Sequence, residues 1–262
     1  MKNLKHQLNF QRKNLLKILR KIHLKRKSKA LTELNCMTFT NKGYVEYTKN
    51  LILSSQKNSV NVNIKVYALD QYSYDYFKSF HENVFLYKKE DFQNRYLSQS
   101  DKNFGNLMIV KFELIYKELL ENENVLYIDG DIVFKKNLSS YLLNYSPNVD
   151  IVFQDDLRPS KPDLENLCAG FMYIKSNKTT VDFFKPTSKL IRKFNKYKTH
   201  DQTYINKNKN KFTYSKLPLN DFPNGAHYYQ YFDTLSPYMV HFNYVRGDEK
   251  LNLMKKHNEW YL

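Results

Sequence analysis

The feature that most constrains the fold is an apolar run in mid-chain that ends in two carboxylates. Residues Val125–Ile128 are followed directly by Asp129-Gly130-Asp131. The apolar residues favour a buried strand, and two carboxylates at the end of such a strand need compensating partners. In α/β sheets, ligands bind beyond the carboxyl ends of strands. The segment therefore predicts an α/β fold with functional groups at this strand end.

Segments that favour strands and helices alternate along the rest of the chain. We expect strands at 36–40, 63–69, 84–87, 125–128, 151–154, 171–174, 212–216 and 238–241, with 132–134 continuing the strand that ends at 128. We expect helices at 44–56, 71–80, 106–120 and 179–195, the last kinked at Pro186, and a final helix from about 248. Residues 88–105 are polar and expected to be irregular. This order predicts a three-layer α/β/α architecture, a single domain over residues 35–262 with a mixed, mostly parallel central sheet.

The positive charge is concentrated at the N-terminus. The chain has 42 Lys and Arg against 26 Asp and Glu, and residues 1–34 hold 11 of the basic residues and one acidic residue. Leucines in this segment recur at helical spacing between the basic residues, which predicts a basic amphipathic arm. The arm is interpreted either as a solvated tail or as a docking segment for an anionic surface, lipid or nucleic acid.

Composition excludes several protein classes. At 42% hydrophobic residues the chain is not disordered, and two cysteines are too few for a disulfide scaffold. No apolar run approaches the roughly 20 residues of a membrane span, and no signal-peptide pattern opens the chain. We therefore expect a cytoplasmic protein, which the arm could attach to a membrane surface. Cys36 and Cys168 are expected to be small buried residues.

The two mid-chain carboxylates suit metal binding. In extended geometry Asp129 and Asp131 project to the same side, and Gly130 lets a ligand approach the backbone. Carboxylates are hard oxygen ligands that suit Mg²⁺ or Mn²⁺ bridged to a diphosphate. An Asp-Gly-Asp turn without function is the alternative.

A phosphatase is a second interpretation of the same residues. Asp129-Gly130-Asp131-Ile132-Val133 resembles the first motif of haloacid-dehalogenase-type phosphatases, in which the first Asp is the nucleophile. That family also needs a later Gly-Asp followed four residues on by Asp. The chain offers only Gly247-Asp248 with Asn252, so this remains a minor alternative.

Five features in order resemble one enzyme family. They are Thr38–Asn41 with Tyr44, a helix with Lys111 before the Asp129-Gly130-Asp131 strand, the strand Cys168–Ile174, the pair Asp201-Gln202, and His241-Phe242-Asn243 with Gly247 and Lys250. Together they cover about 36–262 and resemble the nucleotide-diphospho-sugar transferase family, GT-A-fold glycosyltransferases related to glycogenin-like and plant xylosyltransferase-type enzymes. Cys168 stands where many relatives carry Asn.

The resemblance implies roles for individual residues. Asp129, Asp131 and His241 would bind one Mn²⁺ or Mg²⁺. Donor-binding residues would be Thr40, Asn41, Tyr44, Lys111, Gly170, Gly247 and Lys250, and catalytic residues would be Asp201, Gln202 and Asp156. Taken singly, His241 could be an ordinary strand-end histidine and Lys250 a solvated lysine. Asp201 could equally be a helix N-cap.

The resemblance implies a metal-dependent hexosyl- or pentosyltransferase that moves a sugar from a nucleotide-diphosphate donor to a glycan, protein or small-molecule acceptor, with retention of configuration. Retention by double displacement would need a carboxylate, for which Asp155, Asp156 and Asp201 are candidates. A same-face route would need none, and the sequence leaves both open. The competing hypothesis is a protein that binds anionic surfaces through its charge. Nucleic acid is not the expected partner, because the charge lies mainly in the arm.

Overall fold

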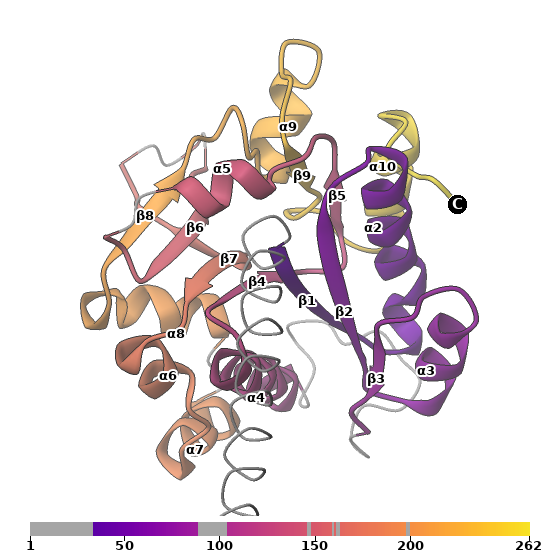
Figure 1. Ribbon diagram of the computed structural model, residues 1–262. Helices are drawn as coiled ribbons and strands as arrows, with labels where there is room; N and C mark the ends of the chain where they lie inside the picture. Colours follow the sequence, from indigo (N-terminus) through magenta and orange to yellow (C-terminus); the bar gives the residue numbers. More distant parts are fainter. Residues whose placement is uncertain (1–33, 89–103, 146–147, 159, 161–162, 198–199) are drawn as a thin grey trace, which may run out of the picture.

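The strands form one large mixed sheet with a small second sheet beside it (Figure 1). The computed structural model describes residues 34–88, 104–145, 148–158, 160, 163–197 and 200–262. Within these residues, seven strands lie in the order β3-β2-β1-β4-β7-β6-β8. They are β1 (Leu34–Thr40), β2 (Val62–Ala68), β3 (Val84–Leu86), β4 (Asn124–Ile128), β6 (Ile151–Asp155), β7 (Leu167–Lys175) and β8 (Tyr214–Leu217). Only β7 runs antiparallel to its neighbours, β4 and β6, so the predicted mixed, mostly parallel sheet is confirmed.

Helices cover both faces of the sheet and give the predicted three layers. Buried residues of α4, α6, α7 and α8 pack on one face, and those of α2, α3 and α5 pack on the other (Figure 1). The helices are α2 (Val45–Lys57), α3 (Gln71–Lys78), α4 (Phe104–Glu121), α5 (Ser139–Asn144), α6 (Lys178–Phe184), α7 (Ser188–Tyr197), α8 (Asp201–Lys207), α9 (Gly225–Tyr231) and α10 (Gly247–Lys256). Two short 3₁₀ turns span Lys42–Tyr44 and Lys209–Lys211.

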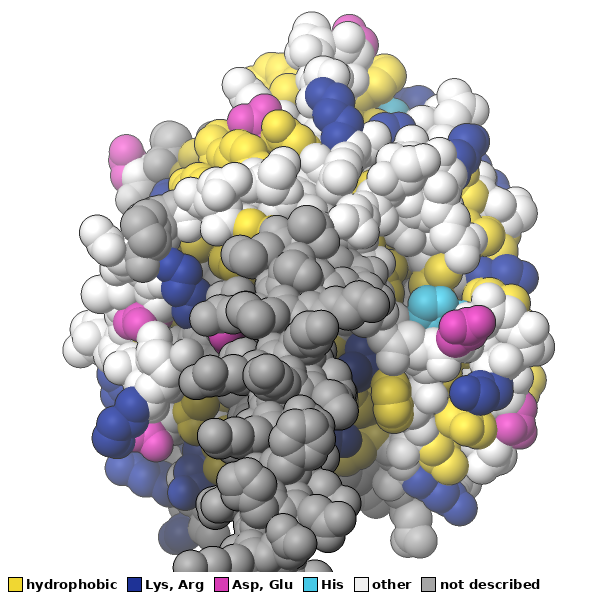
Figure 2. All heavy atoms as spheres, viewed as in Figure 1, with side chains coloured by type: hydrophobic (Ala, Val, Ile, Leu, Met, Phe, Trp, Pro, Cys, Tyr) yellow, Lys and Arg dark blue, Asp and Glu magenta, His cyan; other side chains and the backbone are white. Residues whose placement is uncertain are grey.

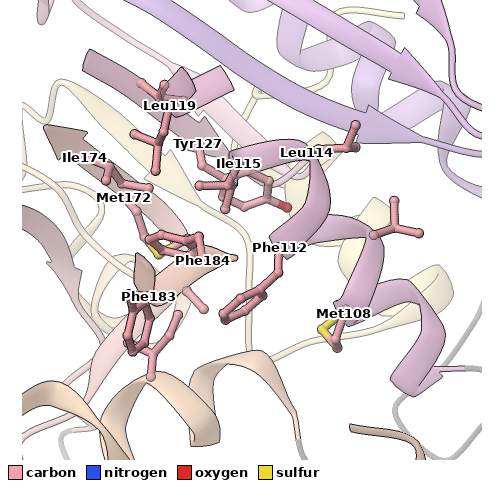
Figure 3. Packing of buried hydrophobic residues seen from close by; sticks show 14 of the residues in the cluster. Met108, Phe112, Leu114, Ile115, Leu119, Tyr127, Met172, Ile174, Phe183 and Phe184 are labelled. Carbon is pink, nitrogen blue, oxygen red and sulfur yellow. The ribbon is translucent and has the colours of Figure 1, made fainter. Parts of the chain in front are cut away.

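Helix α4 supplies much of the core on its face (Figure 3). Met108, Phe112, Ile115 and Leu119 recur at helical spacing and are all buried, as the sequence predicts. The ring of Phe112 lies 5.0 Å from that of Phe184 on α6. A large aromatic ring buried in this way stabilises the fold by about 3–5 kcal/mol relative to alanine. This packing fixes α4, and with it the side chains that α4 directs towards the strand ends.

The predicted helix 179–195 is two helices rather than one kinked helix. Helix α6 ends at Phe184 and α7 begins at Ser188. Lys185 has an extended backbone, with φ −58° and ψ 124°. A residue before proline is sterically excluded from the helical region, and Pro186 itself lacks the N–H that a continuous helix needs. The prediction of a kink was therefore wrong, and the helix breaks.

Strand β5 (Ile132–Phe134) does not continue β4, contrary to the prediction. It leaves the main sheet and pairs with β9 (Met239–His241) in an antiparallel two-stranded sheet. The register places Ile132 opposite His241, and the N–H of Phe242 donates to the carbonyl of Asp131 at 3.1 Å. This small sheet carries the C-terminal segment to the end of β4.

Helices α5 and α9 were not predicted. Each is six or seven residues long, which is too short to show a hydrophobic period. The chain turns at Phe222–Pro223 just before α9, and Asn224 caps the helix by accepting from the N–H of His227 at 2.9 Å.

The predicted arm lies outside the described residues except for Leu34. That residue is the first of β1, pairs with Val62 and is 2% exposed. The interval expected to be irregular likewise lies mostly outside the described residues. In the part of the chain that the structure describes, no helix is both long enough and apolar enough to cross a membrane. Cys36 and Cys168 are free and buried, as predicted.

Basic side chains are dispersed on the face shown in Figure 2. The dark-blue Lys and Arg side chains of the described residues lie there in separate small groups, one of them at the lower left beside magenta carboxylates. A nucleic-acid-binding face would carry them as one continuous patch. This face of the domain therefore gives no support to the hypothesis of a surface-binding protein.

Candidate active site

The end of β4 places two carboxylates at the edge of a cavity. Strand β4 stops at Ile128, and the N–H of Asp129 still donates to the carbonyl of Gly170 on β7 at 2.8 Å. The chain then turns through Gly130, so that both Asp129 and Asp131 line a cavity of about 920 Å³. The cavity lies beyond strand ends, where ligands bind in α/β sheets.

His241 completes a three-residue group with these carboxylates. One ligand atom each from Asp129, Asp131 and His241 can be chosen so that all lie within 4.8 Å of one another. His241 is buried at the end of β9, and its Nε2 lies 3.3 Å from Oδ1 of Asp131. The pairing of β5 with β9 produces this approach between residues 110 positions apart in the sequence. The structure thus brings the three predicted metal ligands together.

Gly170 on β7 makes room for this group. A Cβ atom at that position would lie 2.6 Å from Oδ2 of Asp129 and in contact with Cε1 of His241. Any side chain would therefore push the ligands apart. The predicted role of Gly170 at the donor site is consistent with this close packing.

Lys250 and His241 both contact Asp131. Lys250, in the first turn of α10, forms an ion pair with Oδ2 of Asp131. Burial alone would raise the pKa of Asp131, but Lys250 and His241 outweigh it and hold the pKa well below its usual value. Burial alone would lower the pKa of His241, but Asp131 outweighs it and raises the pKa. Asp131 is therefore an ionised carboxylate between the ammonium group of Lys250 and the imidazole of His241.

Lys111 of α4 is buried in the wall of the cavity. Its ammonium group lies 2.5 Å from Oδ2 of Asp201 and 3.3 Å from Oδ1 of Asp129, and it donates to the carbonyl of Ala169 at 3.1 Å. Burial would lower the pKa of Lys111, but Asp129 and Asp201 outweigh it and raise the pKa. Tyr127 donates to the same oxygen of Asp129 at 2.6 Å. Lys111 thus links Asp129 to Asp201 at the start of helix α8.

Asp156 is a carboxylate held by neutral amides. It is 4% exposed, and its Oδ2 accepts from Gln202 Nε2 at 2.7 Å and from Asn166 Nδ2 at 2.8 Å. Its Oδ1 accepts from Asn243 Nδ2 at 3.0 Å. Among the described residues no ion pair to Asp156 is present. Its neighbour Asp155 does not line the cavity and instead pairs with Lys216 at 2.7 Å.

Gln202 and Asp201 open helix α8 at the cavity. Gln202 also accepts, through Oε1, a long hydrogen bond of 3.4 Å from the N–H of Ala169. His200, rather than Asp201, is the N-cap residue of α8, so the N-cap alternative for Asp201 is wrong. Both residues line the cavity, as their predicted catalytic roles require.

The predicted donor-binding residues are divided between the cavity and its surroundings. Asn41 and Tyr44 line the cavity, and the Asn41 side chain accepts from the N–H of Gly43 at 3.1 Å. Thr40 does not line it, and its hydroxyl is bonded instead to that of Thr48 at 3.1 Å. Gly247 lies outside the lining as well, with a φ of +55° that favours glycine at the start of α10.

Several polar residues of the site were not predicted. Gln154 hydrogen-bonds His241, Asn166 hydrogen-bonds Asp156, and Tyr244 donates from its hydroxyl to the carbonyl of Asp156 at 3.0 Å. Gln154 had a usable signal, because it is a polar residue at the end of the apolar run 151–153. Asn166 and Tyr244 had none, since their roles depend on contacts across the sheet.

Comparison with known proteins gives one family match over most of the chain. The model of the nucleotide-diphospho-sugar transferase family matches residues 60–254. A curated relative, the UDP-galactose:fucoside alpha-3-galactosyltransferase of Dictyostelium discoideum, is 22% identical over 272 residues. The alignment covers 85% of this chain and 42% of the relative, so the chain spans less than half of that protein. These matches confirm the resemblance that the motifs predicted.

Solved glycosyltransferases share the fold at low sequence identity. The galactosyltransferase LgtC, solved with donor and acceptor sugar analogues, is 11% identical with a TM-score of 0.55, over 87% of this chain and 97% of that one. The glycosyltransferase GlyE of Streptococcus pneumoniae is 15% identical with a TM-score of 0.55, over 82% of this chain and 56% of that one. At these identities the likeness shows the fold, and it confirms the predicted GT-A-type α/β architecture.

Proposed function

Because the chain belongs to the nucleotide-diphospho-sugar transferase family, we propose that it transfers a sugar from a nucleotide-diphosphate donor to an acceptor hydroxyl, dependent on a divalent ion and with retention of configuration. The family membership also confirms the predicted enzyme class, a glycosyltransferase. The observation that carries the proposal is the convergence of Asp129, Asp131 and His241 in the same cavity as Lys250.

The residues present fit a divalent ion. Two carboxylates and one imidazole are a donor set that suits Mn²⁺ or Mg²⁺. The space that Gly170 leaves beside Asp129 and His241 would be filled by any other residue. When bound, the ion would neutralise negative charge on the diphosphate and favour its departure. Lys250 would supply a second positive charge to the same group.

The donor would extend from Lys250 towards Asn41 and Tyr44. Asn41 and Tyr44 lie just after β1, at the two ends of the turn that follows it. They line the cavity together with Asp129, Asp131 and His241. Tyr44 offers an aromatic surface on which a base can stack. The name of the Dictyostelium relative makes UDP-galactose the first donor to test.

The reaction breaks the bond between the anomeric carbon and the diphosphate oxygen, whose electron pair leaves with the diphosphate. The acceptor oxygen forms the new bond to that carbon, and its proton passes to the leaving phosphate oxygen. Asp201 is paired with Lys111, and Asp156 has both oxygens hydrogen-bonded. These contacts favour the same-face route over attack by either carboxylate.

Asp156 would then act through its charge. It lies in the cavity wall, and the amides of Gln202, Asn166 and Asn243 that donate hydrogen bonds to it carry no positive charge. Departure of the diphosphate leaves positive charge on the sugar ring. A fixed negative charge nearby stabilises that transition state.

The phosphatase alternative receives no support from these findings. The family match covers residues 60–254, which include the Asp129 motif on which that alternative depends. Asp129 is also engaged by Tyr127 and Lys111 rather than exposed as a free nucleophile.

A screen of nucleotide sugars tests the proposal. The full chain would be incubated with UDP-galactose and other donors, with Mn²⁺ or with a chelator, and release of the nucleotide diphosphate would be measured. We expect release only with the ion, and its loss in Asp131→Asn but not in Asp182→Asn, an exposed carboxylate on α6 that serves as the control. Equal release with chelator would contradict metal dependence, and an inverted product by NMR would contradict retention.

A further inference from the structure

Gln154 is a buried amide directly behind the predicted metal ligand His241. It is 0% exposed, lies on β6, and does not line the cavity. It therefore touches neither donor nor acceptor. A fully buried amide in an apolar strand costs free energy unless its hydrogen-bonding groups are satisfied.

Both N–H groups of the amide are used by main-chain carbonyls. Nε2 of Gln154 donates to the carbonyl of Pro223 at 2.9 Å and to that of Phe222 at 3.2 Å. If the Gln154 amide were flipped, its Oε1 would face the carbonyl oxygens of Phe222 and Pro223, which would repel it. The Gln154 orientation is therefore fixed, and its Oε1 can only accept a hydrogen bond.

That oxygen lies 2.8 Å from Nδ1 of His241. Since Oε1 can only accept, Nδ1 must carry a proton. The other ring nitrogen, Nε2, faces Asp131 at 3.3 Å. The same turn also holds the histidine backbone, because the carbonyl of Pro223 accepts from the N–H of His241 at 3.2 Å.

We propose that Gln154 is a positioning residue, which holds the proton of His241 on Nδ1 and leaves Nε2 as the metal-binding nitrogen beside Asp129 and Asp131. The inference rests on the proposed metal-dependent function. A histidine that binds a metal through one nitrogen needs a hydrogen-bond acceptor at the other, which fixes the tautomer and the plane of the ring. In this chain the acceptor is an amide oxygen that the Phe222–Pro223 turn holds in place.

Two substitutions separate this role from a purely structural one. Gln154→Glu and Gln154→Met both remove the two N–H donors to the turn. Only Gln154→Glu keeps an acceptor for Nδ1. A role in holding the turn predicts at least as much damage in Gln154→Glu as in Gln154→Met, because a carboxylate oxygen would face the two carbonyls, whereas a role through His241 predicts damage chiefly in Gln154→Met.

The measurement is Mn²⁺ binding to the full chain, followed by electron paramagnetic resonance without any sugar donor. We expect Gln154→Met to weaken Mn²⁺ binding roughly 10- to 100-fold and Gln154→Glu to bind about as well as the parent protein. Equal loss in both variants, or no loss in either, would overturn the inference while leaving the proposed function intact. If the parent protein itself binds no Mn²⁺, the proposed function fails as well.

A second measurement needs no variant at Gln154 and so does not depend on how those variants fold. In ¹⁵N-histidine-labelled parent protein with Mg²⁺, the resonance lost in His241→Ala identifies the ring. We expect its proton on Nδ1. A proton on Nε2 would overturn the inference.

Discussion

Two carboxylates of the cavity, the half-buried Asp131 and the buried Asp156, are stabilised in opposite ways. Asp131 contacts the ammonium group of Lys250 and the imidazole of His241. Asp156 accepts hydrogen bonds from three neutral amides and, within the described residues, has no ion pair. The positive charge of Lys250 offsets the negative charge of Asp131, and a bound metal ion could do the same. The amides around Asp156 carry no positive charge that could offset its negative charge.

The difference indicates opposite electrostatic roles for these two carboxylates of the cavity lining. On the proposed function, Lys250 and the ion that Asp131 helps to bind would together face the negative diphosphate of the donor. At Asp156, an unneutralised carboxylate stands where positive charge would develop on the sugar. A buried charge without a counter-ion is costly, so proteins keep one mainly where a function uses it. The comparison therefore predicts that the two residues affect different steps.

The largest expected effect is a separation of metal binding from turnover. Asp131→Asn removes a charged ligand and should abolish both Mn²⁺ binding and turnover. Asp156→Asn keeps the size of the side chain and should lower turnover roughly 100-fold while leaving Mn²⁺ affinity unchanged, because only transition-state charge stabilisation is lost. Calorimetry with Mn²⁺ and a turnover assay on both variants test this. Loss of Mn²⁺ binding in Asp156→Asn would remove the distinction between Asp131 and Asp156.

Gly170→Ala should weaken metal binding by Asp129, Asp131 and His241 without affecting Asp156. The added methyl group would contact His241 and lie 2.6 Å from Oδ2 of Asp129, so the ligands must move apart. We expect Mn²⁺ affinity to fall roughly tenfold or more, with some loss of stability from overpacking. Mn²⁺ titration and thermal unfolding of the variant provide the measurements. Unchanged Mn²⁺ affinity would mean that the three ligands do not bind one ion through this space.

The outcome for individual residues shows what the sequence could predict. The strand Val125–Ile128 and the carboxylates after it were recognised because one short segment carries the whole signal. His241 and Lys250 were recognised only through a resemblance, since nothing local links them to Asp131. The antiparallel pairing of β5 with β9 creates that link, and it was not predicted.

Other parts could not be predicted because their cause is non-local or very short. Gln154 does stand out as a polar residue after an apolar run, but its contact with the turn Phe222–Pro223, nearly 70 residues away in the sequence, is non-local. Helix α9 begins at that turn but has only seven residues, too few for a hydrophobic period to show. The break at Pro186 did have a local signal, and its strength was underestimated.

Lys250→Ala tests whether Lys250 binds the diphosphate of the donor. The lost contact would be to phosphate, and a charged hydrogen bond is worth roughly 1.5–3 kcal/mol, so binding of UDP should weaken about tenfold or more while binding of uridine changes little. Calorimetry with UDP and with uridine, each in Mn²⁺, measures the difference. Lys256→Ala, an exposed lysine near the end of the same helix, is the control.

The same variant also tests the competition at Asp131. Without Lys250, one oxygen of Asp131 loses its ion pair, so Mn²⁺ alone should bind at least as tightly as to the parent protein. If Lys250→Ala weakens Mn²⁺ and UDP binding equally, the lysine supports the metal group instead of the phosphate, and the assignment of α10 to the donor fails.

The smallest expected effect concerns Cys168, a second neighbour of the His241 ring. Its Sγ lies 3.5 Å from Nδ1 of His241, farther than the 2.8 Å of Gln154 Oε1. Burial raises the pKa of the Cys168 thiol, so the group stays neutral and is only a weak acceptor. Cys168→Ala should therefore change Mn²⁺ affinity by no more than about twofold, since weak sulfur contacts are worth about half a kcal/mol. Electron paramagnetic resonance with Mn²⁺ on Cys168→Ala and Gln154→Met, measured side by side, compares the two partners of the ring. A loss in Cys168→Ala as large as that in Gln154→Met would show that the thiol, rather than the amide, holds His241 in place.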